Sequence, residues 1–204
     1  MNLSIQQLDE EIEEAATVIK KGGVCVIPTE TAYGLAASIH FENALKRIYL
    51  IKKRPYNKPL LLLIRKLEEA PLDFSLIPAY AYGLMKTFWP GPLTLLLPAK
   101  RGIHYFLAGH TNKVGIRMSS NPVAMELVKR VGGAITATSA NLSGLELTKT
   151  IDQVKEQLKE GPDYFLDAGS IAPGPPSTIV DCSGQAPLIV RAGAIPPEDI
   201  LAVD

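Results

Sequence analysis

The sequence has 204 residues, 47% of them hydrophobic, and its 21 basic residues balance 21 acidic ones. This length and apolar content suffice for one substantial core, so we expect a single domain over residues 1–204. A net charge of zero argues against broad, nonspecific binding to nucleic acid, although it leaves room for a local basic cleft.

The cysteines and histidines are few and widely spaced. Cys25 and Cys182 lack the C-x-x-C spacing of zinc or redox sites, so we expect reduced, apolar thiols and a cytoplasmic protein. His40, His104 and His110 do not share the helical spacing of metal ligands, and we expect no dedicated metal site. A signal-peptide pattern and a membrane-length apolar run are both missing, so no membrane segment is predicted.

Strand and helix patterns alternate along the chain. Apolar residues at helical spacing predict helices over residues 8–21, 44–53, 79–88, 122–131, 151–159 and 197–202. Short apolar, β-rich runs predict strands over residues 24–27, 36–39, 59–64, 93–97, 114–118, 134–138, 164–166, 177–181 and 188–190. This alternation is typical of the α/β class, and we expect one twisted mixed sheet flanked by helices.

The buried strand at 24–27 runs into a polar turn. Pro28 ends the strand, and two threonines, a glutamate and a tyrosine follow before Gly34. Loops at strand ends commonly carry binding groups, but an ordinary strand-loop connection with capping threonines explains the same pattern.

A basic segment follows, with six cations between residues 46 and 58. Cations in a last helical turn often serve only to complement the helix dipole. Because the residue before a proline is pushed out of the α region, however, Arg54 and Lys58 should lie on a loop. Two loop cations between a helix and a strand suggest a site for phosphate or carboxylate.

Further polar groups recur at strand ends, where open α/β sheets usually place their sites. Arg117 ends an otherwise apolar strand, so it either points outward or meets an anion. The whole set comprises Thr31, Arg54, Lys58, Arg117, Ser139, Asn141, Ser177 and Arg191. A G-x-S-x-G elbow, a Walker A sequence and a G-x-G-x-x-G loop are all missing. Residue spacing alone therefore supports an anion-binding α/β protein, with a nucleotide as one candidate ligand.

Seven blocks, in order, resemble the YrdC/TsaC family, the threonylcarbamoyl-AMP synthases. The first reads Lys-Gly-Gly-Val-Cys-Val-Ile-Pro-Thr-Glu-Thr-Ala-Tyr-Gly-Leu at residues 21–35. The others lie at residues 52–60, 88–94, 114–122, 139–144, 177–181 and 189–193. The resemblance extends over about residues 8–195 and implies the YrdC-like fold in its single-domain form.

The resemblance implies an enzyme, a nucleotidyltransferase that converts L-threonine, bicarbonate or carbon dioxide, and ATP into threonylcarbamoyl-AMP and pyrophosphate. The product would serve the threonylcarbamoyladenosine modification of tRNA, so tRNA and tRNA-modification proteins are expected partners. Magnesium would arrive with the nucleotide. Threonine would be held by Thr31, Arg117, Ser139 and Ser177. ATP would be bound by Lys52, Arg54, Lys58, Lys113, Asn141, Lys149 and Arg191.

The sequence departs from the family pattern at two places, and two other functions stay open. Leu63 stands where members often carry histidine. After the Ser-Gly of the Asn141 loop, members often read Ser-Pro-Thr, whereas this chain has Leu147-Thr148-Lys149-Thr150. A non-catalytic module binding double-stranded RNA or tRNA is one alternative, disfavoured by zero net charge and missing aromatic stacking motifs. The other is a related carbamoyl-adenylate activity like that of hydrogenase-maturation proteins, disfavoured because their accompanying modules are missing.

Overall fold

The structure, a computed structural model, describes residues 5–159, 161–172 and 174–203. Its helices are α1 (Ile5–Lys20), α2 (Glu42–Lys52), α3 (Ala79–Phe88), α4 (Tyr105–Ala108), α5 (Pro122–Val131), α6 (Ile151–Leu158) and α7 (Pro197–Leu201). Two 3-10 turns lie at Leu67–Glu69 and Phe74–Leu76. Helices and strands alternate as expected, which confirms the mixed α/β class.

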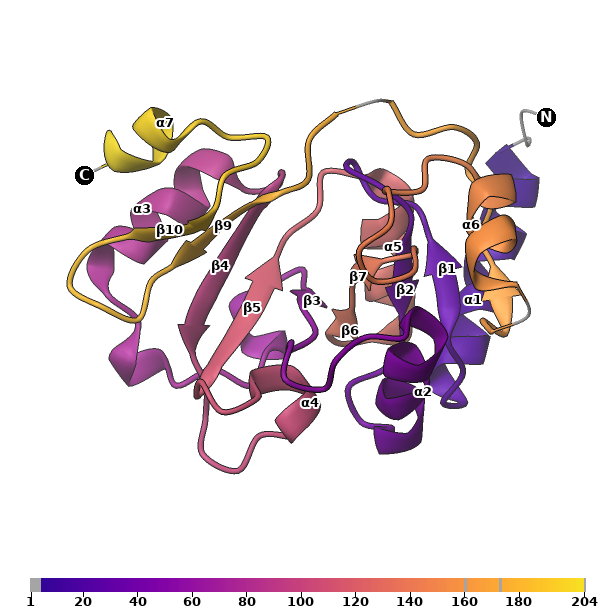
Figure 1. The fold of residues 1–204 in the computed structure, drawn as a ribbon, viewed down its shortest axis with the longest axis horizontal. Coiled ribbons are helices and arrows are strands. Elements are labelled where there is room, and N and C mark those ends of the chain that lie inside the picture. The colour runs from indigo at the N-terminus through magenta and orange to yellow at the C-terminus, as the bar shows by residue number, and fades with distance from the viewer. Residues whose placement is uncertain (1–4, 160, 173, 204) are drawn as a thin grey trace.

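The strands form two twisted mixed sheets that lie side by side (Figure 1). The smaller sheet has the order β7-β2-β1-β8, from β7 (Thr138–Ser139), β2 (Gly34–Ala36), β1 (Cys25–Ile27) and β8 (Tyr164–Phe165). The larger has the order β10-β9-β4-β5-β3-β6, from β10 (Leu188–Arg191), β9 (Thr178–Asp181), β4 (Leu93–Pro98), β5 (Lys113–Arg117), β3 (Leu62–Leu63) and β6 (Ile135–Thr136).

The expectation of one sheet is thus corrected to two sheets that adjoin. A bridge between Ser38 and Ile135 connects them, and Thr136 N donates to Ala37 O at 2.9 Å. The predicted strand at 134–138 divides at Ala137 into β6 and β7, which belong to different sheets. Sequence periodicity cannot reveal such a division, because both halves keep an extended backbone.

Helix α1 shows how the apolar pattern is used. Ile12, Ala15, Ala16 and Ile19 are buried as their spacing predicted, in a hydrophobic cluster that includes residues of α5. The helix ends at Lys20, and Gly22 adopts a φ of +84°, a conformation that favours glycine. The chain then enters the fully buried strand β1.

Helix α5 begins as the sequence predicted. The Asn121 side-chain oxygen accepts hydrogen bonds from the backbone of Val123 (3.0 Å) and Ala124 (3.1 Å), and Pro122 occupies the first turn. This capped helix follows β5 directly and fixes the end of that strand, where Arg117 lies.

Several predicted boundaries moved by a few residues, two strands among them, and one helix was missed. The strand expected at 36–39 is β2 at Gly34–Ala36, because Gly34 pairs with both Ile27 and Ser139. The strand expected at 59–64 shrinks to Leu62–Leu63. Helix α4 has four residues, too few for a periodic signal, and its Phe106 O accepts from Leu60 N at 2.9 Å.

Candidate functional site

A cavity of about 620 Å³ lies between the two sheets, a size typical of small-molecule sites. One wall comes from the loop after β1 and from β2 and β7, and the other from β4, β5, β9, β10 and the loop after α2. The candidate residues that line it are Thr31, Arg54, Lys58, Arg117, Ser139, Ser177 and Arg191. The expectation that polar groups at strand ends converge is therefore met by these seven residues.

Arg54 and Lys58 lie on the loop after α2, where the sequence placed them. The helix ends because Lys53 adopts a left-handed φ of 49° and Arg54 N donates to Tyr49 O at 2.9 Å. Arg54 Nε donates to Lys58 O and its Nη2 to Pro59 O, both at 3.0 Å. These bonds use two of the five guanidinium donors, which leaves the others for a ligand.

Arg191 forms the opposite cationic corner, at the end of β10. Its Nη2 donates to Ser177 O at 2.6 Å and to Ser177 Oγ at 3.0 Å, and Ser177 Oγ lies 2.9 Å from Thr94 Oγ1. Burial lowers the pKa of Arg191, and the positive charge of Arg117 lowers it further. Two guanidinium groups that repel each other across a cavity favour an anion between them.

Gly193 allows this corner to form. A Cβ at this position would lie 2.3 Å from Pro176 O, so a side chain would push the backbone before Ser177 away. Ala194 N also donates to Pro176 O at 2.9 Å. The missing side chain at Gly193 therefore lets the backbone before β9 approach the backbone after β10 closely.

Arg117 is buried, with an exposed fraction of 7%. Its Nη1 lies 3.6 Å from Glu30 Oε1 and 3.3 Å from Thr31 Oγ1. Ser119 Oγ donates to the other oxygen of Glu30, while Glu30 Oε1 itself is buried without a hydrogen bond among the described residues. Burial lowers the pKa of Arg117, and Glu30 opposes that shift. Of the two options that the sequence left open, the structure shows that Arg117 meets an anion, which the protein supplies itself.

Lys52 and Asn141 lie outside the cavity lining. Lys52 is 1% exposed, and its ammonium donates to the main-chain oxygens of Ser139 and Asn141 and to Asn141 Oδ1. Burial lowers the pKa of Lys52 to about 7, and the nearby charge of Arg54 acts in the same direction. The network reaches the cavity through Ser139, whose hydroxyl lies 2.5 Å from Asn141 Oδ1.

Lys113 and Lys149 also lie outside the lining and have partners within the protein. Lys113 lies on β5, four residues before Arg117, and forms an ion pair with Asp181. Lys149 Nζ donates to Thr31 O and lies 3.5 Å from Gly174 O. Burial lowers its pKa. Lys149 thus holds the Thr31 loop beside the chain segment that leads to Ser177.

Leu63 is fully buried in the hydrophobic cluster with α1 and α5, and Leu61 lines the cavity instead. Strand alternation sends Leu62 and Leu63 into two different hydrophobic clusters on opposite faces of β3, whereas Leu61 precedes the strand. In this chain, the departure from histidine at position 63 therefore affects core packing and not the cavity lining.

Sequence reasoning missed several residues of the site. Glu30 is the most consequential, because it neutralises Arg117; its place between two threonines was noted, but no pattern paired it with a strand 87 residues away. The lining also includes, among others, Asn57, Leu61, Leu96, Ile179 and Val190. Leu96, Ile179 and Val190 lie on strands, but nothing local shows which face of a strand lines a cavity.

Metal sites, cysteines and membrane-spanning helices can be assessed over the part of the chain that the structure describes. There, no group of three or more His, Cys, Asp and Glu side chains could hold a metal ion. Cys25 and Cys182 are buried and free, as expected, and burial raises the pKa of both thiols to about 12. Among the described helices, none is long and apolar enough to cross a membrane.

Comparison with known proteins connects this site to a family. Residues 17–193 match the Sua5_yciO_yrdC family model, which is described as "Telomere recombination". A Pyrococcus abyssi protein named "Threonylcarbamoyl-AMP synthase" is 36% identical over 94% of this chain and 58% of its own length. The structure of P. abyssi Sua5 complexed with L-threonine has a TM-score of 0.87 at 36% identity, over 93% of this chain and 56% of that one.

A second kind of relative matches over nearly its whole length. "Uncharacterized protein YciO" of Escherichia coli is 32% identical over 89% of this chain and 88% of its own. By contrast, the chain spans little more than half of the P. abyssi protein. Both relatives share the matched domain, and the resemblance found in the sequence is confirmed: this chain belongs to the Sua5/YciO/YrdC family.

Proposed function

We propose that the chain is an L-threonylcarbamoyl-AMP synthase. It would combine L-threonine, bicarbonate or carbon dioxide, and ATP into threonylcarbamoyl-AMP and pyrophosphate. The observation that carries the proposal is one cavity with two cationic corners, Arg54 with Lys58 on one loop and Arg191 beside Ser177 at two strand ends. The similarity to P. abyssi Sua5, whose complex contains L-threonine, supports the choice of amino acid.

The proposed chemistry asks the protein for positioning and charge neutralisation. The threonine amine and bicarbonate form a carbamate with loss of water. A carbamate oxygen then attacks the α-phosphorus of ATP, and the bond from that phosphorus to the bridging oxygen breaks as pyrophosphate leaves. Charge accumulates on the transferring phosphoryl group and on the leaving pyrophosphate, so arginines and a lysine around a partly enclosed cavity fit the need.

The two substrates would occupy different parts of the cavity. Arg54, Lys58 and Arg191 suit the triphosphate, because main-chain oxygens fix both guanidinium groups. Arg117 suits the threonine carboxylate: its 3.6 Å separation from Glu30 is too long for a hydrogen bond, so donors remain free. Thr31, Ser139 and Ser177 would supply hydroxyl contacts to the same substrate.

Magnesium would enter with the triphosphate and be held chiefly by its oxygens. Glu30 and Asp181 fit this arrangement, because Glu30 already accepts from Ser119 and Asp181 already pairs with Lys113. The product would pass to enzymes that modify tRNA, and such a role would place the protein in the cytoplasm. Lys113, Asn141 and Lys149 would then act on ATP at most indirectly, through the elements that they hold.

The test is pyrophosphate release from ATP and magnesium, with L-threonine and bicarbonate added singly and together. We expect release that requires both, with threonylcarbamoyl-AMP detected by mass spectrometry. Release with bicarbonate and a different amine would replace threonine in the proposal. Nucleotide binding without release under any combination would overturn the proposal.

A further inference from the structure

Lys52, the last residue of α2, has an ionisable side chain held inside the protein. It is 1% exposed, whereas lysine is almost never fully buried unless it is paired. The carbonyl end of a helix carries partial negative charge and favours a cation there. The contacts of the ammonium show what it holds in place.

All the acceptors of Lys52 Nζ belong to one segment, the end of β7 and the loop after it. They are the main-chain oxygen of Ser139, that of Asn141 at 2.7 Å, and Asn141 Oδ1 at 3.3 Å. Three acceptors match the three N–H groups of an ammonium. The main-chain oxygen of Lys52 also accepts from Ser143 N at 2.9 Å. Both ends of this residue therefore attach α2 to the loop over residues 139–143.

Asn141 extends these contacts to the cavity. Its Oδ1 lies 2.5 Å from Ser139 Oγ, and its Nδ2 donates to Leu145 O at 2.6 Å. Asn141 is itself 5% exposed, whereas Ser139 lines the cavity. On the other side, Arg54 follows Lys52 by two residues and also lines the cavity. One buried ammonium thus lies between two parts of the site that are 85 positions apart in sequence.

We infer that Lys52 is a positioning residue, which fixes the 139–143 loop against the end of α2 so that Ser139 and Arg54 keep a set separation across the cavity. The inference rests on the proposed function and differs from the sequence-based expectation that Lys52 binds ATP. A direct phosphate ligand must present N–H groups to the cavity, whereas those of Lys52 face three protein oxygens.

The two roles make different predictions for affinity and turnover. A phosphate ligand contributes binding energy even to an isolated triphosphate. A positioning residue mainly affects the alignment of the two substrates, so its loss lowers kcat more than anion affinity. Replacing Lys52 by methionine keeps most of the side-chain length and removes the ammonium.

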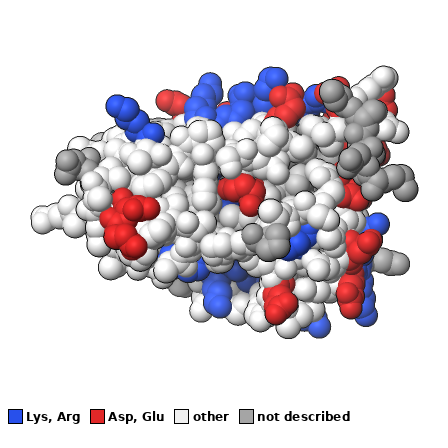
Figure 2. Space-filling model, turned by 90° about the horizontal axis from the view of Figure 1, so that it is seen from above, with Lys and Arg blue, Asp and Glu red and all other residues white. Residues whose placement is uncertain are grey.

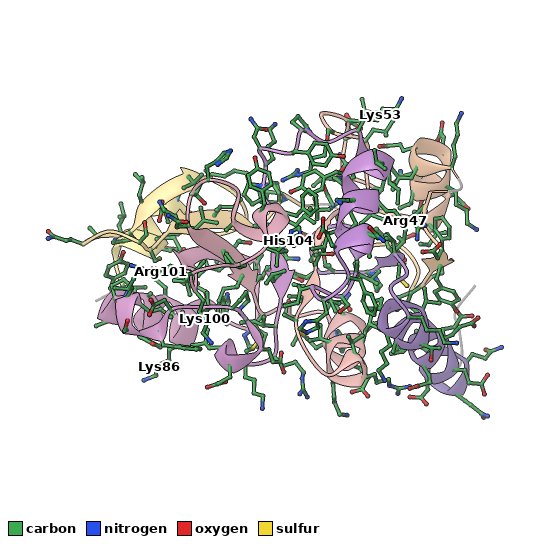
Figure 3. All side chains as sticks on the ribbon, turned by 90° about the horizontal axis from the view of Figure 1, so that it is seen from below. Arg47, Lys53, Lys86, Lys100, Arg101 and His104 are labelled. Atoms are coloured by element: carbon green, nitrogen blue, oxygen red, sulfur yellow. The ribbon has the colours of Figure 1, made fainter. Side chains whose placement is uncertain are left out.

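The experiment compares Lys52→Met with Lys53→Met. Lys53 is exposed and lies at the periphery of the molecule (Figure 3), one residue along the same chain. Affinity for inorganic tripolyphosphate is measured by calorimetry, and kcat from threonine- and bicarbonate-dependent pyrophosphate release at saturating ATP. For Lys52→Met we expect a tripolyphosphate Kd within about threefold of wild type and a kcat about 30-fold lower. Lys53→Met should change neither.

Two results would overturn the inference. One is a loss of tripolyphosphate affinity of about tenfold or more with kcat retained at saturating ATP, the pattern of a direct ligand. The other is an unchanged kcat in a folded Lys52→Met protein. If that variant does not fold, Asn141→Ala gives the same comparison, because it removes a partner of the ammonium while Lys52 stays in place.

A double variant adds a readout that a general loss of structure would not give. If Lys52 acts through Asn141, the combined effect of Lys52→Met and Asn141→Ala on kcat should be clearly smaller than the product of the single effects. If the effects of the two substitutions on kcat multiply fully, Lys52 does not act through Asn141, and this part of the inference is overturned. Should wild type release no pyrophosphate, the proposed function fails by itself, and the tripolyphosphate comparison still decides whether Lys52 is an anion ligand.

Discussion

The arginine on α5 and two arginines of the cavity, Arg54 and Arg191, have different kinds of partner. Arg130 contacts three carboxylates of the protein, those of Asp9, Glu13 and Glu126. Arg54 and Arg191 instead donate to main-chain oxygens, which orient a guanidinium but do not cancel its charge. The protein therefore supplies the anions that neutralise Arg130, and we call these ion pairs the surface network. Arg54 and Arg191 instead keep their charge for an anion from outside the chain.

The distribution of charge over the surface agrees with this contrast. On the face shown in Figure 2, basic and acidic side chains are interspersed among wide uncharged areas. With 21 residues of each sign, the chain has no net charge to attract a polyanion as a whole. Anion recognition is therefore expected from the geometry of the cavity.

The largest predicted effect follows from removing a cavity arginine. Arg54→Ala should lower kcat/KM for ATP by about 100-fold, because a fixed donor to the phosphates is lost. The free energy of unfolding should change little, since Arg54 lies on a loop. The measurement is pyrophosphate release with thermal unfolding as the control for folding, and undiminished turnover in a folded variant would remove Arg54 from the site.

Arg117 distinguishes the two substrates. Arg117→Ala should raise the threonine KM by about 30-fold and the ATP KM by much less, because a charge-assisted contact to the carboxylate is lost. Initial rates with each substrate varied in turn provide the test. A larger effect on ATP would mean that the two substrates are assigned to the wrong corners.

Glu30→Gln is a useful companion variant, because it removes the negative charge beside Arg117 and keeps the side-chain shape. Arg117 should then attract the substrate carboxylate more strongly, so the threonine KM should fall or stay constant. A rise comparable to that of Arg117→Ala would show that Glu30 itself contacts the substrate.

The pH dependence of stability tests the buried ammonium. Burial lowers the pKa of Lys52 to about 7, well below the usual value near 10.5. Between these two values the unfolded chain binds more protons than the folded one, so the contribution of Lys52 to stability rises with pH and is lost below about pH 7. The free energy of unfolding of wild type relative to Lys52→Met should therefore rise from pH 7 to 10, by up to about 1.4 kcal/mol per pH unit. A constant difference across this range would mean that Lys52 keeps its ordinary pKa.

The smallest effect is expected on the surface. Arg130→Ala should lower the free energy of unfolding by about 0.5–1 kcal/mol, less at high salt, because exposed ion pairs are screened. Pyrophosphate release should stay at the wild-type level. A loss of activity as large as that of Arg54→Ala would mean that Arg130 also contributes to the reaction, contrary to the comparison above.

The sequence predicted those features that depend on neighbours along the chain. The apolar stripe of α1, the Asn121 cap of α5, and the loop that Pro55 imposes on Arg54 are local, and the structure confirms all three. The resemblance carried by seven ordered blocks identified the family. Single-domain organisation and the roles of the individual site residues stay predictions.

The tertiary structure alone decided which of these residues meet. It divided the strands into two sheets, paired Arg117 with Glu30, placed Lys52 inside the protein and turned Leu61 rather than Leu63 toward the cavity. Local pattern specifies backbone conformation and which side of an element is apolar. Contacts between residues such as Lys52 and Asn141 depend on how sheets and loops pack across long sequence separations, and no short stretch of sequence encodes that packing.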